Sequence, residues 1–160
     1  MSAGINTNTF DLDADGIDRH CGVNFLGQFY AINLLYPLIR KTSKIPDEPP
    51  PRIVFEASEV HRMAHSTIHF GSLEEINDKE FSPTHLYARS KLAMILCAKF
   101  LLPEKVFKKN GDHVLFLERA PGYRQYHHAT AMEGCISGPF RKNAVLGYDN
   151  CREGYRTGIL

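Results

Sequence analysis

One short run of β-branched and aromatic residues, Arg52-Ile-Val-Phe-Glu-Ala57, separates two long segments whose apolar residues recur at helical spacing. The run follows three prolines and predicts a strand, and its almost continuous apolar character is typical of a strand buried on both faces of a parallel sheet. We expect helices over residues 15–42 and 84–108 and a second strand over residues 113–117. This alternation indicates an α/β fold with only part of its sheet.

The charge balance of the chain limits its partners. Lys and Arg number 19 against 18 Asp and Glu, which leaves a net charge of +1 and gives no reason to expect nucleic acid or an anionic membrane as partner. No apolar run approaches the ~20 residues needed to span a bilayer, and the first residues do not resemble a signal peptide. The four cysteines form no CxxC pair, so we expect reduced thiols and take a cytoplasmic location as the default.

The pair Tyr87 and Lys91 carries the strongest chemical signal, because positions four apart lie on one face of a helix. A free phenol has a pKa of ~10, and a neighbouring ammonium stabilises the phenolate and lowers that pKa. A phenol tuned in this way can donate or accept a proton at a carbonyl or hydroxyl oxygen. Alone, this spacing often arises by chance, so other residues must decide between catalysis and a surface tyrosine.

Two further polar residues occupy positions suited to a site. Ser58 directly follows the predicted strand, at the end of the sheet where α/β proteins bind ligands, and its hydroxyl could polarise a carbonyl. Asn24 lies inside the first apolar helix, where an amide without a partner would cost about 1–3 kcal/mol. The alternatives are a serine that starts a loop and an amide satisfied within the core.

Four stretches together resemble the short-chain dehydrogenase/reductase family. The stretches are Ser2-Ala-Gly-Ile5, Val23-Asn-Phe-Leu-Gly-Gln-Phe29, Arg52 to His61 and Tyr87-Ala-Arg-Ser-Lys-Leu-Ala93. They are similar to the end of the family's Asn-Asn-Ala-Gly motif, its V-N-x-x-G-x-F helix, its R-I-V-x-x-S-S-x-x-H strand (with Ala57 replacing the first serine) and its Y-x-x-S-K-L-A helix. The resemblance runs from residue 2 to about residue 114. The long spacing between Ser58 and Tyr87 resembles that of the family branch with retinol-dehydrogenase-like and fungal carbonyl-reductase-like members.

The resemblance implies a partial Rossmann-like fold, a doubly wound parallel sheet, and an oxidoreductase that acts on a carbonyl or alcohol with NAD(P)(H). Tyr87 would be the general acid/base, while Lys91 would favour its ionisation and hold the nicotinamide ribose. Ser58 would polarise the carbonyl, and Asn24 would hold a water that relays protons to Lys91.

The family also implies contacts beyond the acid–base residues. Ala3 and Gly4 would line the cofactor. Family members pair through the two helices that precede and contain the tyrosine motif, so the resemblance implies a homo-oligomer through residues 15–42 and 84–108.

Two features depart from the family. The T-G-x-x-x-G-x-G turn that cradles the cofactor's pyrophosphate does not occur, so we expect the N-terminal cofactor half of the fold to be missing. The family also continues to a P-G-x-V-x-T segment, whereas here Pro121-Gly122 is followed by Tyr123-Arg-Gln-Tyr-His-His128. Reading permitted codons from Glu118 one base later restores that motif in its expected place. We therefore divide the chain into residues 1–114, part of the Rossmann domain, and residues 115–160, a frameshifted and poorly ordered tail.

The histidines His61, His65 and His69 form a rival group, because side chains four apart on a helix can bind zinc. No Glu lies between them as in an HExxH motif. The segment 58–83 is polar and loop-like, with a short helical piece near residues 72–77. Surface histidines are the favoured interpretation, and a metal site is the alternative.

Two functions remain open. The first is an NAD(P)(H)-dependent oxidoreductase of which this chain is a truncated, inactive form. The second is a non-catalytic fragment that pairs through its two long helices with a full-length subunit. The substrate and the choice between NAD and NADP do not follow from the residues present.

Overall fold

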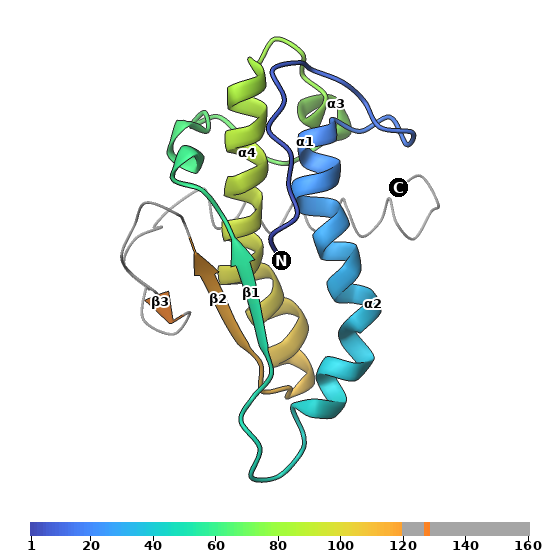
Figure 1. Ribbon diagram of the computed structural model, residues 1–160, viewed down its shortest axis with the longest axis vertical. Helices are drawn as coiled ribbons and strands as arrows, with labels where there is room; N and C mark the ends of the chain where they lie inside the picture. The colour runs from blue at the N-terminus through green and yellow to red at the C-terminus, as the bar shows by residue number, and fades with distance from the viewer. Residues whose placement is uncertain (120–126, 129–160) are drawn as a thin grey trace.

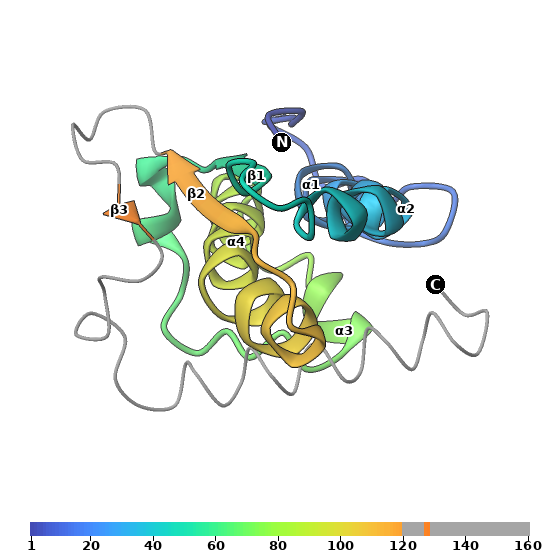
Figure 2. The same ribbon diagram turned by 90° about the horizontal axis from the view of Figure 1, so that it is seen from below.

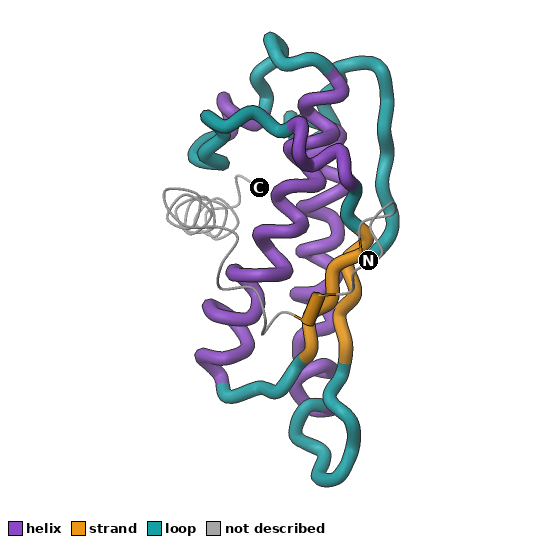
Figure 3. Tube along the Cα trace, turned by 90° about the vertical axis from the view of Figure 1, so that its left-hand side faces the viewer, coloured by secondary structure: helices purple, strands orange, loops and turns teal. Residues whose placement is uncertain are grey.

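The computed structural model describes residues 1–119 and 127–128, and these residues form two layers (Figure 3). One layer is a small sheet of β1 (Arg52–Glu56), β2 (Leu115–Arg119) and β3 (His127–His128), hydrogen-bonded in that order. The other layer is helical: its later helical stretch lies behind the sheet in the view of Figure 1, and its earlier one lies beside the sheet. The α/β fold class is therefore confirmed in its coarse form, as part of a Rossmann-like arrangement.

The first helical stretch is continuous but starts later than predicted. It consists of α1 (Arg19–Cys21), a π-helical segment (Gly22–Leu26) and α2 (Gly27–Thr42). The predicted start at residue 15 is wrong because Gly16 takes a positive φ of 76° in a turn, a conformation that ends any regular helix. Asp18 is the N-cap instead, and its carboxylate accepts a hydrogen bond from the Cys21 N–H. The predicted end at Thr42 is confirmed.

The second helical stretch follows the prediction closely. Ser82 caps α4 (Pro83–Leu96), with Pro83 in the first turn, where its missing N–H costs nothing. A π-helical segment (Cys97–Phe107) and a short 3₁₀ helix (Lys108–Asn110) continue it to Gly111, whose φ of 68° ends the helix. The loop between β1 and α4 contains a 3₁₀ helix at Glu59–Met63 and α3 (Leu73–Ile76), which confirms the predicted short helical piece.

The strand β1 is where predicted, and it pairs in parallel with β2, Arg52 opposite Leu115. The prediction that both of its faces are buried is wrong. Ile53 and Phe55 are buried, whereas Val54 between them is 43% exposed, because the helices of the described residues cover only one face of the sheet (Figure 2). The strand therefore alternates, as a half-covered strand does.

The core lies between β1, β2 and the two helical stretches. Its buried members are Ile32, Ile53, Phe55, Met94, Cys97, Ala98, Leu101, Leu102, Phe107 and Phe116. The tail predicted at residues 115–160 supplies β2 and β3, and the rest of it lies outside the described residues, so the predicted division of the chain stays a prediction.

Candidate active site

An extended segment, residues 1–7, leads from the sheet to the start of α1 and lies between α4 and the first helical stretch (Figure 1). The Met1 amino group donates to the Val54 carbonyl at 2.6 Å, and the Met1 carbonyl accepts from the Glu56 N–H at 3.0 Å. Met1 thus lines the edge of β1 opposite β2. This path carries Ala3 and Gly4 past the carboxyl end of β1, where we expected ligand-binding residues.

Gly4 sits against two of the predicted site residues. A Cβ at Gly4 would lie 3.1 Å from the Asn24 Oδ1 and 3.5 Å from the Lys91 Nζ. The first distance is too short for an ordinary contact, so a side chain here would displace Asn24. Glycine keeps the space beside the Lys91 ammonium open.

Lys91 projects from α4 toward the end of β1. The residue is only 5% exposed, and its Nζ donates to the Glu56 carbonyl at 3.0 Å. Burial lowers the pKa of Lys91 because it penalises the ammonium, and the negative charge of Glu56 opposes that shift in part. The structure therefore holds a cation in a dry environment with one fixed hydrogen bond.

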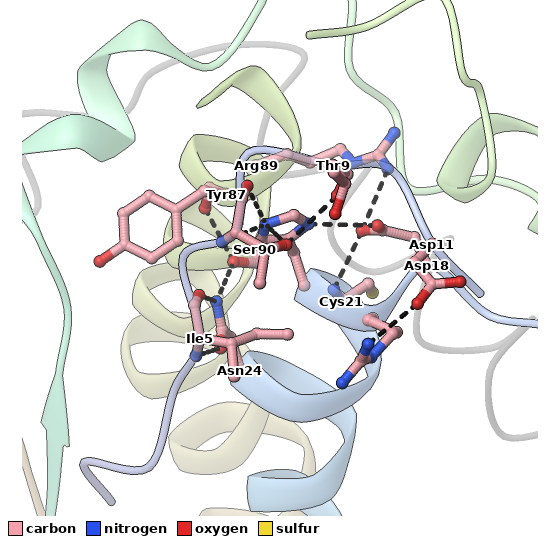
Figure 4. A network of polar contacts seen from close by, with 12 residues as sticks. Ile5, Thr9, Asp11, Asp18, Cys21, Asn24, Tyr87, Arg89 and Ser90 are labelled. Carbon is pink, nitrogen blue, oxygen red and sulfur yellow. Dashed lines mark hydrogen bonds and ion pairs between the residues drawn. The ribbon is translucent and has the colours of Figure 1, made fainter. Parts of the chain in front are cut away.

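Tyr87 lies one turn before Lys91 on the same helix. The Lys91 Nζ is 5.7 Å from the centre of the Tyr87 ring, so the two side chains are neighbours, as the spacing predicted. The ring is half-buried and packs against the His20 ring, with 6.5 Å between ring centres and 74° between planes. Figure 4 shows the phenol pointing away from the polar network behind it.

Asn24 is fully buried and all of its amide atoms are used. Its Oδ1 accepts from the Ile5 N–H at 2.7 Å, and its Nδ2 donates to the Ile5 carbonyl and to the Ser90 Oγ, both at 2.9 Å (Figure 4). The Ser90 hydroxyl in turn donates to the Tyr87 carbonyl at 2.7 Å. Asn24 thereby ties the extended segment to the helix that carries Tyr87.

Ser58 follows β1 directly, as predicted, but its hydroxyl has a local role here. It caps the 3₁₀ helix Glu59–Met63 by accepting a hydrogen bond from the Val60 N–H at 3.3 Å. That short helix packs against α4. The structure thus brings Ala3, Gly4, Asn24, Tyr87 and Lys91 together, while Ser58 lies at the neighbouring end of β1.

The three spaced histidines do not share a helix. The His61 Nδ1 contacts the Ser58 carbonyl, whereas the His65 Nδ1 contacts the Thr67 Oγ1, both at 2.7 Å. His69 lies further along the loop, and its backbone N–H donates to Glu75. Among the residues that the structure describes, no three His, Cys, Asp or Glu side chains are grouped as metal ligands. Nor is any helix within this described part long and apolar enough to cross a membrane.

Sequence reasoning missed a polar cluster behind the site. His20, Asp18 and Gln28 are buried on the first helical stretch, and Arg89 is buried on α4. The available signal was the four-residue spacing of His20, Asn24 and Gln28, which places three polar side chains along one side of an otherwise apolar helix.

Known proteins similar to the chain are oxidoreductases. The chain is 30% identical to bli-4 of Neurospora crassa, named as a mitochondrial oxidoreductase, over 91% of this chain and 38% of that protein. It is 36% identical to retinol dehydrogenase 11 of Mus musculus over 62% of this chain and 28% of that protein. The chain belongs to the short-chain dehydrogenase/reductase family.

A solved structure shares the fold of the chain. A protein from Mycobacterium paratuberculosis matches with a TM-score of 0.57 and 25% identity, over 90% of this chain and 44% of that one. No family model matches the chain. The short-chain dehydrogenase/reductase relatives are much longer, and this chain spans only 38%, 33% and 28% of the first three of them.

Proposed function

We propose that this chain carries the acid–base side of a nicotinamide-dependent oxidoreductase site that interconverts a carbonyl and an alcohol. The observation that supports it most is the buried Lys91 ammonium, one helical turn from the Tyr87 ring and next to Gly4 and Asn24. Burying an ammonium group costs free energy unless a partner offsets the loss of hydration. A buried lysine therefore indicates a site where negative charge forms on a neighbouring group during a reaction.

In this proposal Tyr87 donates its phenolic proton to the carbonyl oxygen when a carbonyl is reduced and takes it back from the alcohol in the reverse direction. Lys91 stabilises the phenolate that remains. Ser58 turns its hydroxyl from the Val60 N–H toward the substrate oxygen and polarises it. Asn24 keeps α4 and the extended segment in place, since its amide atoms are all used in hydrogen bonds to Ile5 and Ser90.

The residues present fit one side of a nicotinamide cofactor. The space that a Gly4 side chain would fill lies beside the Lys91 Nζ, which can donate to ribose hydroxyls, and Ala3 and Gly4 supply exposed backbone there. The cofactor, NAD(P)(H), supplies the hydride when bound. By their names, relatives act on retinol and polyprenol, and we propose isoprenoid alcohols and aldehydes as the first substrates to test.

The decisive experiment replaces Tyr87 by Phe and follows nicotinamide absorbance with retinal and polyprenal. The variant loses the acid, and we expect the rate to fall by roughly 10²–10⁴-fold. The control is Ser66→Ala, which removes an exposed hydroxyl from the loop between β1 and α4. Equal rates for Tyr87→Phe and the parent would rule out the proposed acid. A parent chain without turnover would agree with the predicted inactivity of this length of chain.

A second proposal concerns pairing. Tyr30, Leu34 and Leu38 recur every four residues on α2 and are 44%, 62% and 62% exposed. An apolar stripe on the outer side of a long helix favours contact with another helix. We propose that this stripe pairs the chain with a second copy or with a full-length subunit of the same family.

A further inference from the structure

Three buried polar side chains of the first helical stretch hold the backbone of the extended segment at alternate residues. The Gln28 Nε2 donates to the Ala3 carbonyl at 2.5 Å. Asn24 makes the paired hydrogen bonds to Ile5 described above. The His20 Nε2 accepts from the Thr7 N–H at 3.2 Å.

The two spacings match, so the contacts form a regular series. Four residues of α-helix rise about 6 Å, and two residues of extended chain advance about 6.6 Å. Helix positions 20, 24 and 28 therefore face segment positions 7, 5 and 3 in antiparallel order. His20 and Asn24 are 0% exposed and Gln28 is 4% exposed, so each of these hydrogen bonds is shielded from water.

The hydrogen bond between His20 and Thr7 is supported by the neighbouring carboxylate of Asp18. The Asp18 Oδ1 lies 3.3 Å from the His20 Nδ1, and a carboxylate at that nitrogen favours the tautomer with a proton on Nδ1. In that tautomer the Nε2 accepts from the Thr7 N–H and can accept from the Thr7 hydroxyl, while the Thr7 carbonyl, also 3.2 Å away, forms no hydrogen bond with it. Asp18 is in turn 3.9 Å from the guanidinium of Arg89, which donates to the carbonyls of Glu75 and Ile76.

We infer that His20 and Gln28, on either side of Asn24, form a polar ladder that fixes the register of residues 3–7, and that both are positioning residues for Ala3 and Gly4. Without the outer rungs, only Asn24 and the hydrogen bonds of Met1 to β1 would hold the segment, and Gly4 could shift relative to the Lys91 Nζ. The part of this inference that concerns the cofactor rests on the proposed function. The inference that these side chains hold residues 3–7 in place is independent of the proposed function.

The test measures amide hydrogen exchange, residue by residue, in the parent chain and in His20→Ala and Gln28→Leu. Loss of one hydrogen bond should speed exchange across residues 4–7 by about tenfold, while β1 and α4 keep their protection. His20→Gln, whose amide oxygen can accept, should restore part of the protection at Thr7. The matched control is Asn8→Ala, an exposed change on the same loop that leaves all three rungs in place.

Unchanged exchange at residues 4–7 in both variants would overturn the ladder. If His20→Ala instead unfolds the whole chain, Thr7→Pro decides, because it removes the donated N–H and leaves every buried side chain in place. Fast exchange confined to the segment in that variant supports the ladder, and slow exchange there contradicts it.

A titration with the reduced nicotinamide dinucleotide, followed by its fluorescence, tests the positioning. We expect Gln28→Leu to raise the Kd about tenfold and Asn8→Ala to leave it unchanged. Equal Kd values for Gln28→Leu and the parent would refute the positioning role. A parent chain that does not bind the dinucleotide counts against the proposed function, while hydrogen exchange still decides the ladder.

Discussion

The position of Lys91 on its helix could be predicted from the sequence, whereas the groups that surround its ammonium could not. The sequence places it four residues after Tyr87 on a helix, which the structure confirms. Its hydrogen bond to the Glu56 carbonyl joins residues 35 positions apart, and no local pattern predicts such a contact. The same limit explains why Gln28 and His20 were missed, since each forms a hydrogen bond with a backbone group of the distant segment 3–7.

The lowered pKa of Lys91 predicts how stability depends on pH. Between its lowered folded value and its ordinary value of 10.5, the unfolded chain binds more protons at this site, so this residue's contribution to the free energy of unfolding rises with pH. Below that window the buried ammonium destabilises the fold fully, and above 10.5 the penalty disappears. Urea unfolding of the parent and of Lys91→Met across alkaline pH measures this contribution to the free energy of unfolding. We expect the parent to gain stability relative to the variant, and parallel pH curves would contradict the shift.

At the scale of elements, Asp112 fastens the last turns of α2 to the loop that enters β2. Its carboxylate accepts from the Tyr36 hydroxyl at 3.0 Å and lies 3.3 Å from the Arg40 Nε and 3.6 Å from the Lys44 Nζ. The carboxylate is buried, whereas the two cationic side chains are about half exposed. The hydrogen bond to Tyr36 therefore contributes more than the screened ion pairs.

Replacing Asp112 by Ala should reduce the free energy of unfolding by about 2 kcal/mol, because it removes a hydrogen bond to a buried charge. Burial raises the pKa of Tyr36 and Asp112 raises it further, so the variant should also bring the Tyr36 pKa closer to its ordinary value. Urea unfolding and an ultraviolet titration of tyrosine measure the two effects. As a control, Asp11→Ala breaks only the exposed ion pair with Arg19 and should change stability by less than about 1 kcal/mol. Equal effects of the two variants would refute the proposed fastening.

Periodicity predicted the elements better than their edges. Helical spacing gave both long helices, but the first begins at Arg19 because a turn at Gly16 depends on one positive φ. The apolar run of β1 implied two covered faces, while Val54 is exposed on the face that the described helices leave uncovered. Composition reports how apolar a strand is, whereas burial depends on which other elements pack against it.

For the whole molecule, the apolar stripe of α2 predicts self-association. Leu34→Glu places a charge in the middle of any contact through the stripe and should weaken the association at least tenfold, since an unpaired charge at an interface core is strongly unfavourable. Asn33→Glu adds the same charge to α2 at an exposed polar position and is the matched control. Sedimentation equilibrium measures both variants against the parent. A parent chain that stays monomeric, or equal effects of the two changes, would refute pairing through this stripe.

The ladder also limits how this part of the chain can vary. Its hydrogen bonds to Ala3 and Ile5 end on main-chain atoms, so they place no demand on the side chains at residues 5 and 6, whereas the Thr7 hydroxyl also contacts the His20 Nε2 at 3.2 Å. The number of residues is a different matter, because one added or lost residue turns the following carbonyl and N–H groups to the opposite side of the extended segment. Substitutions at residues 5 and 6 should therefore accumulate more freely than at Gly4, whereas a single-codon insertion or deletion between Ala3 and Thr7 should be eliminated by selection.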